Sequence, residues 1–173
     1  ALSSLLEETI DEAHGVARGL CPLGADAGAL EAALRTLVRR TGEVSGIACT
    51  FEAVGDVGVA DAVTAQHLYR IAQEAASNAM RHAHAGRISV VLRRDAAGLL
   101  LEVEDDGVGP PAEISAEGMG LRTMACRAGV LEGEFAIMPG RAGGTRVFCR
   151  VPPGGLVRPE KGPQETEEVK YGQ

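Results

Sequence analysis

The sequence lacks any apolar run of the roughly 18 residues that a membrane-spanning helix needs, and no segment resembles a signal peptide. It also lacks an excess of positive charge, because the net charge is −7 at pH 7. This balance argues against a general nucleic-acid-binding surface. The four cysteines include no Cys-x-x-Cys pair, so we expect reduced, mostly buried thiols in a cytosolic protein. We therefore expect neither a nucleic-acid partner nor a membrane contact within these residues.

A length of 173 residues is enough for one compact domain with a sizeable core. The chain begins at Ala1, without a methionine, in a segment whose apolar stripe over residues 1–19 is typical of a helix. We therefore expect a fragment of a longer protein, and any membrane segment of that parent would lie outside this sequence. At the other end, residues 153–173 combine proline and charge with almost nothing apolar, so we expect a disordered tail.

Apolar spacing predicts the elements between these ends. Apolar residues recur every three or four positions in some segments and every second position in others. We expect helices over residues 26–41, 66–84 and 121–130, and strands over residues 47–54, 87–94, 99–105, 133–138 and 145–151. Asp26 is the expected N-cap of the first helix, Gly42 and Gly46 its end, and Gly86 the end of the second. The order predicts an α+β fold, with a mixed, largely antiparallel sheet and helices on one face.

The predicted helix over residues 66–84 carries the first group of candidate functional residues. On its polar face, Glu74 and Asn78 are four residues apart and therefore lie one above the other. A carboxylate beside an amide oxygen suits Mg²⁺, which prefers oxygen ligands and keeps waters and substrate phosphates in its shell. Arg81 and His82, one turn further on, could lean toward those phosphates. Taken alone, such a face is more often a solvated helix surface.

Strand alternation makes Asp105 conspicuous. The inward positions of its strand are Leu99, Leu101, Val103 and then Asp105. A carboxylate at the end of an apolar row is costly unless it is paired or hydrogen-bonded, and a ligand amine would serve. The same count along the last strand puts the hydroxyl of Thr145 on the inward side, near that carboxylate. The alternative is that Asp105 only ends its strand at a turn.

Two glycine-rich segments follow this strand. Gly107 and Gly109 allow a tight turn and the close approach of a flat ligand. Gly118 and Gly120 open the next predicted helix, and backbone amides at a helix N-terminus are a ready site for an anion. Thr123 stands where the third glycine of a Rossmann fingerprint belongs, so that fingerprint is absent. No G-x-x-x-x-G-K-[ST] sequence occurs, which excludes a P-loop.

Taken in order, four segments resemble the N, G1, G2 and final glycine boxes of the GHKL ATPases, a superfamily that includes gyrases and histidine kinases. They are Glu74-x-x-x-Asn78, Asp105-Asp106-Gly107-Val108-Gly109, Gly118-Met119-Gly120-Leu121 and Gly143-Gly144-Thr145. The resemblance covers about residues 26–152. Three features look most like those of bacterial sensor histidine kinases of the nitrate-sensor subgroup: the short lid expected at residues 110–117, the N-box ending Ala-Met-Arg-His-Ala, and the G2 continuation Leu-Arg-Thr-Met-Ala-Cys-Arg-Ala. The resemblance implies the two-layer α/β sandwich of that superfamily (the Bergerat fold) over residues 23–152, with ATP and Mg²⁺ as ligands.

The resemblance also implies roles for single residues. Asp105 would accept from the adenine amine, Asn78 would bind Mg²⁺, and Glu74 would assist phosphoryl transfer. The implied nucleotide-binding set is Asn78, Arg81, His82, Asp105, Gly107, Gly109, Gly118, Gly120, Leu121 and Thr145.

Residues 1–22 are similar to the end of the second helix of that subgroup's dimerisation domain. The implied reaction transfers the γ-phosphate of ATP to a histidine on the first helix of that domain, which this sequence lacks. The implied partners are the protein's own dimerisation domain, in a homodimer of the parent, and a response regulator. We expect this chain alone to bind ATP without phosphorylating any of its own histidines, which are His14, His67, His82 and His84. The alternatives are an anti-sigma-factor-type serine kinase of the same fold and a non-catalytic nucleotide-binding module.

Overall fold

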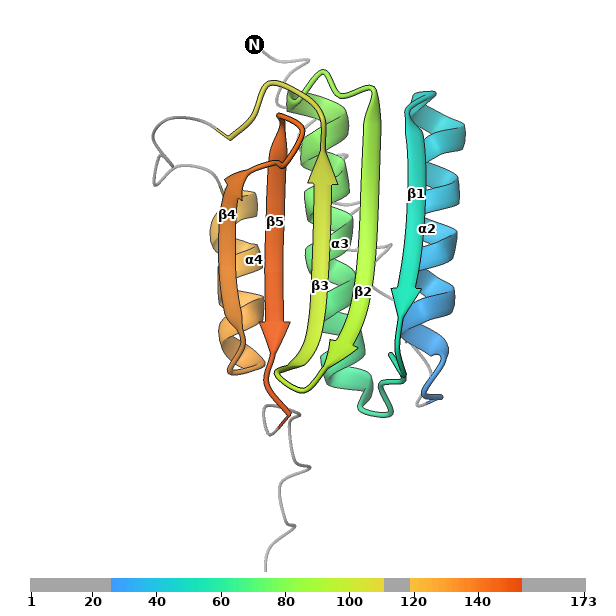
Figure 1. Cartoon of the computed structure of the whole chain (residues 1–173), viewed down its shortest axis with the longest axis vertical. Helices are drawn as coiled ribbons and strands as arrows, with labels where there is room; N and C mark the ends of the chain where they lie inside the picture. Colours follow the sequence, from blue (N-terminus) through green and yellow to red (C-terminus); the bar gives the residue numbers. More distant parts are fainter. Residues whose placement is uncertain (1–25, 111–118, 154–173) are drawn as a thin grey trace, which may run out of the picture.

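The structure is a computed structural model, and it describes residues 26–110 and 119–153. Within these residues, helices cover one face of a five-stranded sheet (Figure 1). The elements in chain order are α2 (Ala29–Ser45), β1 (Ala48–Val54), α3 (Ala62–His82), β2 (Arg87–Asp95), β3 (Gly98–Asp105), α4 (Met119–Val130), β4 (Glu134–Pro139) and β5 (Thr145–Val151). This is the predicted α+β fold, a two-layer sandwich. The predictions for residues 1–22, for the lid beyond Pro110, for Gly118 and for the tail beyond residue 153 lie outside the described residues.

The strand order β1-β2-β3-β5-β4 explains how distant parts of the sequence meet. β1 pairs with β2 in parallel, through the crossover helix α3, and the other pairs are antiparallel. The sheet is therefore mixed and largely antiparallel, as predicted. Because β3 and β5 run in opposite directions, the end of β3 lies beside the start of β5. Their register pairs Glu104 with Arg146, which brings Asp105 next to Thr145.

The helix α3 begins four residues before its predicted start because Asp61 caps it. The Asp61 carboxylate accepts hydrogen bonds from the backbone amides of Val63 (3.4 Å) and Thr64 (2.7 Å). Its predicted end was also wrong, since α3 stops at His82 rather than running on toward Gly86. Ala83 is the C-cap residue, and its carbonyl accepts from the amide of Val108 at 2.9 Å. A glycine loop from another part of the chain thus lies on the end of α3.

The predicted start of α2 was wrong as well, because Gly28 rather than Asp26 is its N-cap, without a side-chain hydrogen bond. At the other end, the prediction was wrong for Gly42 and is confirmed for Gly46. The helix α2 continues past Gly42 to Ser45, and the left-handed residue Gly46 is its C-cap. The reason is that α2 packs closely on β1 at Gly42, where an added Cβ would lie 3.3 Å from the carbonyl oxygen of Ile47. Gly42 therefore serves packing rather than termination.

The core lies between the helix layer and the sheet. The buried face of α3 consists mainly of alanines, which let the helix lie close to the strands. Its largest side chains, Leu68 and Ile71, are fully buried, and each contributes roughly 1.5–3 kcal/mol by burial. They meet the inward residues of β2 and β3, which are Ile88, Val90, Leu92, Leu99, Leu101 and Val103. None of the described helices is long and apolar enough to span a membrane.

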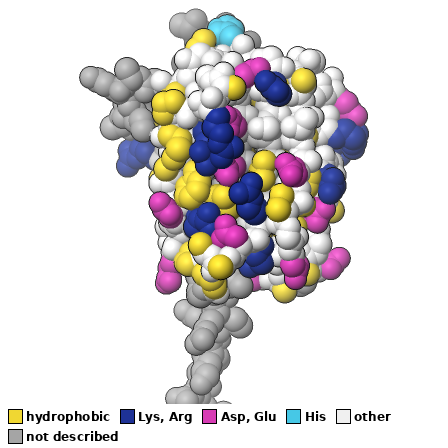
Figure 2. All heavy atoms as spheres, viewed as in Figure 1, with side chains coloured by type: hydrophobic (Ala, Val, Ile, Leu, Met, Phe, Trp, Pro, Cys, Tyr) yellow, Lys and Arg dark blue, Asp and Glu magenta, His cyan; other side chains and the backbone are white. Residues whose placement is uncertain are grey.

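The other face of the sheet is shown in Figure 2, and charged side chains are spread over it among apolar ones. Leu100 and Glu102 on the central strand β3 are only 3% and 5% exposed on this face. Glu102 lies 2.9 Å from Arg141 and 2.7 Å from Arg146, whose aliphatic stems can shield apolar surface. At the far end of β5, Arg150 pairs with Asp95 at 2.8 Å.

Candidate functional site

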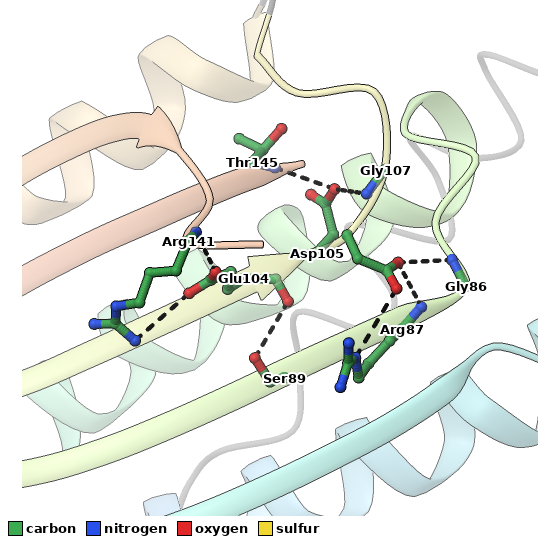
Figure 3. A network of polar contacts seen from close by, with 9 residues as sticks. Gly86, Arg87, Ser89, Glu104, Asp105, Gly107, Arg141 and Thr145 are labelled. Atoms are coloured by element: carbon green, nitrogen blue, oxygen red, sulfur yellow. Dashed lines mark hydrogen bonds and ion pairs between the residues drawn. The ribbon is translucent and has the colours of Figure 1, made fainter. Parts of the chain in front are cut away.

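Asp105 is the last residue of β3, and its side chain points toward the helix layer at only 8% exposure. Its Oδ1 accepts hydrogen bonds from the backbone amides of Gly107 (2.9 Å) and Thr145 (3.2 Å), as Figure 3 shows. The predicted neighbourhood of Asp105 and Thr145 is thus confirmed, but the contact uses the Thr145 amide rather than its hydroxyl. Two amide donors meet the need of a buried carboxylate for partners.

The carboxylate has a second oxygen, Oδ2, which accepts no hydrogen bond from the described residues. Within residues 26–110 and 119–153, both hydrogen bonds to the Asp105 carboxylate end on Oδ1. Because Oδ1 is fixed by two donors from different segments, the direction of Oδ2 is fixed as well. An ordered acceptor at the rim of an apolar core is suited to a ligand that presents an amine.

The glycines around Asp105 allow three backbone segments to approach one another. An added Cβ on Gly144, whose φ is +72°, would collide with the carbonyl of Asp105. One on Gly107 would collide with the carbonyl of Ala83 at the end of α3. Gly109, with φ +89°, faces the carbonyl of Gly144, from which a Cβ would be 3.4 Å away. Packing excludes a side chain at Gly107 and at Gly144, and the positive φ of Gly109 disfavours one there, so the glycines of both loops are needed for this site to form.

On α3, Glu74 lies against the start of α4. An added Cβ on Gly120 would collide with Oε1 of Glu74, so the carboxylate meets the backbone of the second glycine segment. Asn78 is half-buried one turn further along α3. Arg81 and His82 are exposed in the last turn, beside the end of α3 that meets Gly107. The side chain of Leu121 is half-buried and packs against the core.

The predicted residues therefore fall into two contact groups along α3. Asp105, Gly107, Gly109 and Thr145 form the group near its C-terminal end, and Glu74 and Gly120 form the group near its middle. Gly118 lies outside the described residues. No group of three or more His, Cys, Asp or Glu side chains in the described part of the chain could hold a metal ion.

Two acidic neighbours of Asp105 also hold the site together, a role that the sequence did not predict for them. Asp106 accepts hydrogen bonds from the amides of Gly86 and Arg87, both at 2.8 Å. The bonds from Arg87 and then Gly86 keep the pKa of Asp106 below its usual value. Glu104 accepts from the backbone amide of Arg141 at 2.6 Å (Figure 3). The run of three acidic residues was the signal that could have drawn attention to them.

The fold and this site define a two-layer nucleotide-binding domain in which glycine loops meet a helix and a buried carboxylate. Residues 63–155, more than half of the chain, match the sequence profile of the family described as "Histidine kinase-, DNA gyrase B-, and HSP90-like ATPase". The chain belongs to this family. ATP is therefore the nucleotide to place in the site.

Two proteins similar to this chain are named sensor histidine kinases. The chain is 34% identical over 102 residues to "Sensor histidine kinase LiaS" of Bacillus subtilis, a match that covers 58% of this chain and 28% of that protein. It is 33% identical over 144 residues to "Sensor histidine kinase MctS" of Rhizobium johnstonii, which covers 81% of this chain and 31% of that protein. The chain thus spans less than a third of the length of either relative.

Solved structures agree with the fold. The histidine kinase domain of the blue-light-activated histidine kinase of Erythrobacter litoralis EL346 is 26% identical, with a TM-score of 0.57, over 71% of this chain and 60% of that one. Histidine kinase AdeS of Acinetobacter baumannii shares the fold at 16% identity, with a TM-score of 0.61 over 87% of this chain and 83% of that one. The subgroup within the sensor kinases stays a prediction.

Proposed function

We propose that this chain is the ATP-binding catalytic domain of a sensor histidine kinase, which transfers the γ-phosphate of ATP to a histidine of a dimerisation domain. The observation that carries the proposal is the buried Asp105 carboxylate, fixed between the amides of Gly107 and Thr145. Support also comes from the two relatives named sensor histidine kinases. The phosphate would then pass to a response regulator, and the domain would act in the cytoplasm as part of a homodimer.

In this proposal the adenine amine donates to Oδ2 of Asp105, next to Thr145. Gly107 and Gly109 leave room for the flat base because neither carries a side chain. The phosphates extend toward Gly120 and the amide of Leu121 at the start of α4, where a helix N-terminus favours anions. Gly118, which lies outside the described residues, is assigned to the phosphates by the resemblance alone. Arg81 in the last turn of α3 adds positive charge, and the neighbouring His82 adds a polar ring, on the same helix as Glu74 and Asn78.

The residues also suit Mg²⁺. Asn78 offers a neutral oxygen on α3, and Glu74 lies one turn before it. The lack of a three-residue acidic or histidine cluster among the described residues fits an ion held by one or two side chains together with phosphate oxygens. We assign Asn78 as the ligand. When bound, the ion would neutralise phosphate charge, and the protein would contribute positioning rather than covalent chemistry.

We assign Glu74 to the phosphoryl transfer itself. Its carboxylate touches the backbone of Gly120, so it lies beside the segment that would hold the phosphates. From there it can orient the attacking imidazole or accept its proton, a role that requires a free carboxylate near the reacting centre. An acceptor histidine must come within reach of an in-line attack on the γ-phosphate.

Incubation with γ-labelled ATP tests the proposal. The chain alone should bind ATP with Mg²⁺ but take up no stable label, because the resemblance places the acceptor histidine on a helix outside these residues. Adding a dimerisation domain with that helix, in the same chain or separately, should yield an acid-labile phosphohistidine on the added domain. A Glu74→Gln chain serves as the control and should still bind ATP but transfer far less. Stable label on a histidine of this chain alone would contradict the proposal.

A further inference from the structure

The face of the sheet opposite to the helices carries a cluster that holds the loop of the candidate site. Glu104 directly precedes Asp105, so strand alternation points it to the other face. Glu104 Oε1 accepts from the backbone amide of Arg141 (2.6 Å), and its Oε2 lies 3.6 Å from Arg141 Nη1. Arg141 Nη2 also donates to Glu102 Oε1 at 2.9 Å. Three contacts therefore attach one arginine to β3, and we refer to Glu102, Glu104 and Arg141 as the Arg141 clamp.

Arg141 belongs to the turn between β4 and β5, and the other end of this turn enters the site. The amide of Gly140 donates to the carbonyl of Gly144 at 2.9 Å, so the turn is closed and its two ends are coupled. Gly144 packs against the backbone of Asp105, and the amide of Thr145 holds Asp105 Oδ1 at 3.2 Å. A clamp on one face of the sheet thus fixes a hydrogen-bond donor on the other face.

Burial shows which part of the clamp can be removed without loss of the whole cluster. The side chain of Glu102 is only 6% exposed, and its Oε1 also lies 2.7 Å from Nε of Arg146. This contact is an ion pair without the geometry of a hydrogen bond. Arg141 is 64% exposed. Without the Arg141 guanidinium, Glu102 keeps one counter-charge, whereas Glu104 keeps only the backbone amide of residue 141 among the described residues. The specific loss is the pair of guanidinium contacts that hold the turn to Glu102 and Glu104, while the backbone bond of residue 141 to Glu104 remains.

We propose that the Arg141 clamp positions Asp105 and thereby sets the preference for adenine over guanine. The inference rests on the proposed ATP site. Adenine presents an amine where guanine presents a carbonyl oxygen, so a fixed Oδ2 favours the first and repels the second. A loosened turn frees the Thr145 amide, lets the Asp105 carboxylate rotate, and weakens this discrimination. Arg141 touches no nucleotide in this account, so it is a positioning residue.

The test compares Arg141→Ala with Arg150→Ala. Arg150 lies on β5, on the same face of the sheet as the Arg141 clamp but at the other end of the strand. It forms an ion pair of 2.8 Å with Asp95, so it is a matched control. Removing either arginine removes one positive charge, so both variants should bind any nucleoside triphosphate somewhat less well. The informative quantity is the ratio of ATP to GTP affinity, measured by calorimetry with Mg²⁺.

Arg141→Ala should lower this ratio about tenfold, which corresponds to about 1.4 kcal/mol, and Arg150→Ala should leave it unchanged. Glu104→Gln keeps an acceptor for the Arg141 amide but loses the charge, so it should lower the ratio in the same direction. If thermal unfolding shows that Arg141→Ala does not fold, Glu104→Gln alone provides the test.

Two results would overturn the proposed role of the clamp. One is an ATP-to-GTP affinity ratio that is unchanged in Glu104→Gln and, where it folds, in Arg141→Ala. The other is a decrease of this ratio in Arg150→Ala as large as that in Arg141→Ala. A wild-type chain that binds neither nucleotide would instead refute the proposed function and the clamp with it.

Discussion

Three successive acidic residues at the end of β3 have three different partners. Glu104 holds the β4–β5 turn through Arg141, Asp105 holds the amides of Gly107 and Thr145, and Asp106 holds the amides at the start of β2. Alternation sends the outer two to one face and Asp105 to the other. Each carboxylate thus ties a separate segment to the same point. The central one faces the helices and accepts from the described residues on Oδ1 alone, which leaves Oδ2 for a ligand.

Asp105→Asn should weaken ATP binding by roughly 1.5–3 kcal/mol, the usual contribution of a hydrogen bond to a charged group. The Asn oxygen would still accept from Gly107 and Thr145, so its amide NH₂ would take the place of Oδ2 and face the adenine amine. Two donors would then oppose each other. Calorimetry of the wild type and the variant measures the difference, and thermal unfolding confirms that both are folded. Equal affinities would mean that Asp105 only ends a strand.

Asn78→Ala should remove the Mg²⁺-dependent part of ATP affinity and leave the fold intact. Asn78 is half-buried on the polar side of α3, so its loss opens no large cavity in the core. Binding is measured with Mg²⁺ and again with EDTA. The two proteins should differ with the metal and agree without it. If Mg²⁺ strengthens binding equally in both, Asn78 is not the ligand.

The inward position of Asp105 could be predicted because alternation is a property of one strand. Its contact with the Thr145 amide could not, since it depends on how β3 and β5 pair across a separation of 40 residues. The roles of Glu104 and Arg141 were missed for the same reason. Their contact joins residues 37 positions apart, and the sequence shows only that one is acidic and the other basic.

At the scale of elements, strands were predicted more closely than helix ends. All five predicted strands correspond to β1–β5, with ends displaced by one residue at most. Helix ends depend on which side chain reaches which amide. Asp61 caps α3 through Val63 and Thr64, whereas Asp26 precedes α2 without capping it. The two aspartates have the same chemistry, and only the path of the backbone distinguishes them.

The cap on α3 gives a prediction for stability and its dependence on pH. Burial alone would raise the pKa of Asp61, but the hydrogen bonds from Thr64 and Val63 outweigh it and bring the pKa below the usual 3.8. Asp61→Ala should therefore destabilise the chain by about 1 kcal/mol at neutral pH, as typical for loss of an N-cap. Urea unfolding at several pH values measures this.

The sign follows from the lowered pKa. The ionised cap contributes its full stability above 3.8, the unfolded value, and loses it as the pH falls through the lower folded value. The difference between wild type and Asp61→Ala should shrink over that range. The matched control is Asp61→Asn, which keeps a capping oxygen but has no group that titrates. The difference in unfolding free energy between Asp61→Asn and Asp61→Ala should not change over this pH range. A difference between wild type and Asp61→Ala that stays constant with pH would show that the charge of Asp61 is irrelevant.

At the scale of the whole molecule, the topology explains why the site lies at one end of the sheet. The end of β3, the start of β5 and the C-terminal end of α3 meet there, through Asp105, Thr145 and Ala83. The crossover of α3 between the parallel strands β1 and β2 places Glu74 beside Gly120 and Ala83 beside Gly107. Phosphoryl transfer by such a domain relies on positioning, so this convergence of loops on one helix is the part of the fold that matters for activity.

The most direct test of the central claim is a calorimetric titration of the intact 173-residue chain with ATP and with GTP, each with Mg²⁺. We predict one ATP bound per chain, weaker binding when Mg²⁺ is withdrawn, and a clear preference for ATP over GTP. No detectable binding of ATP at millimolar concentration, or equal affinity for the two nucleotides, would contradict the assignment of Asp105 and the loops around it as an adenine nucleotide site.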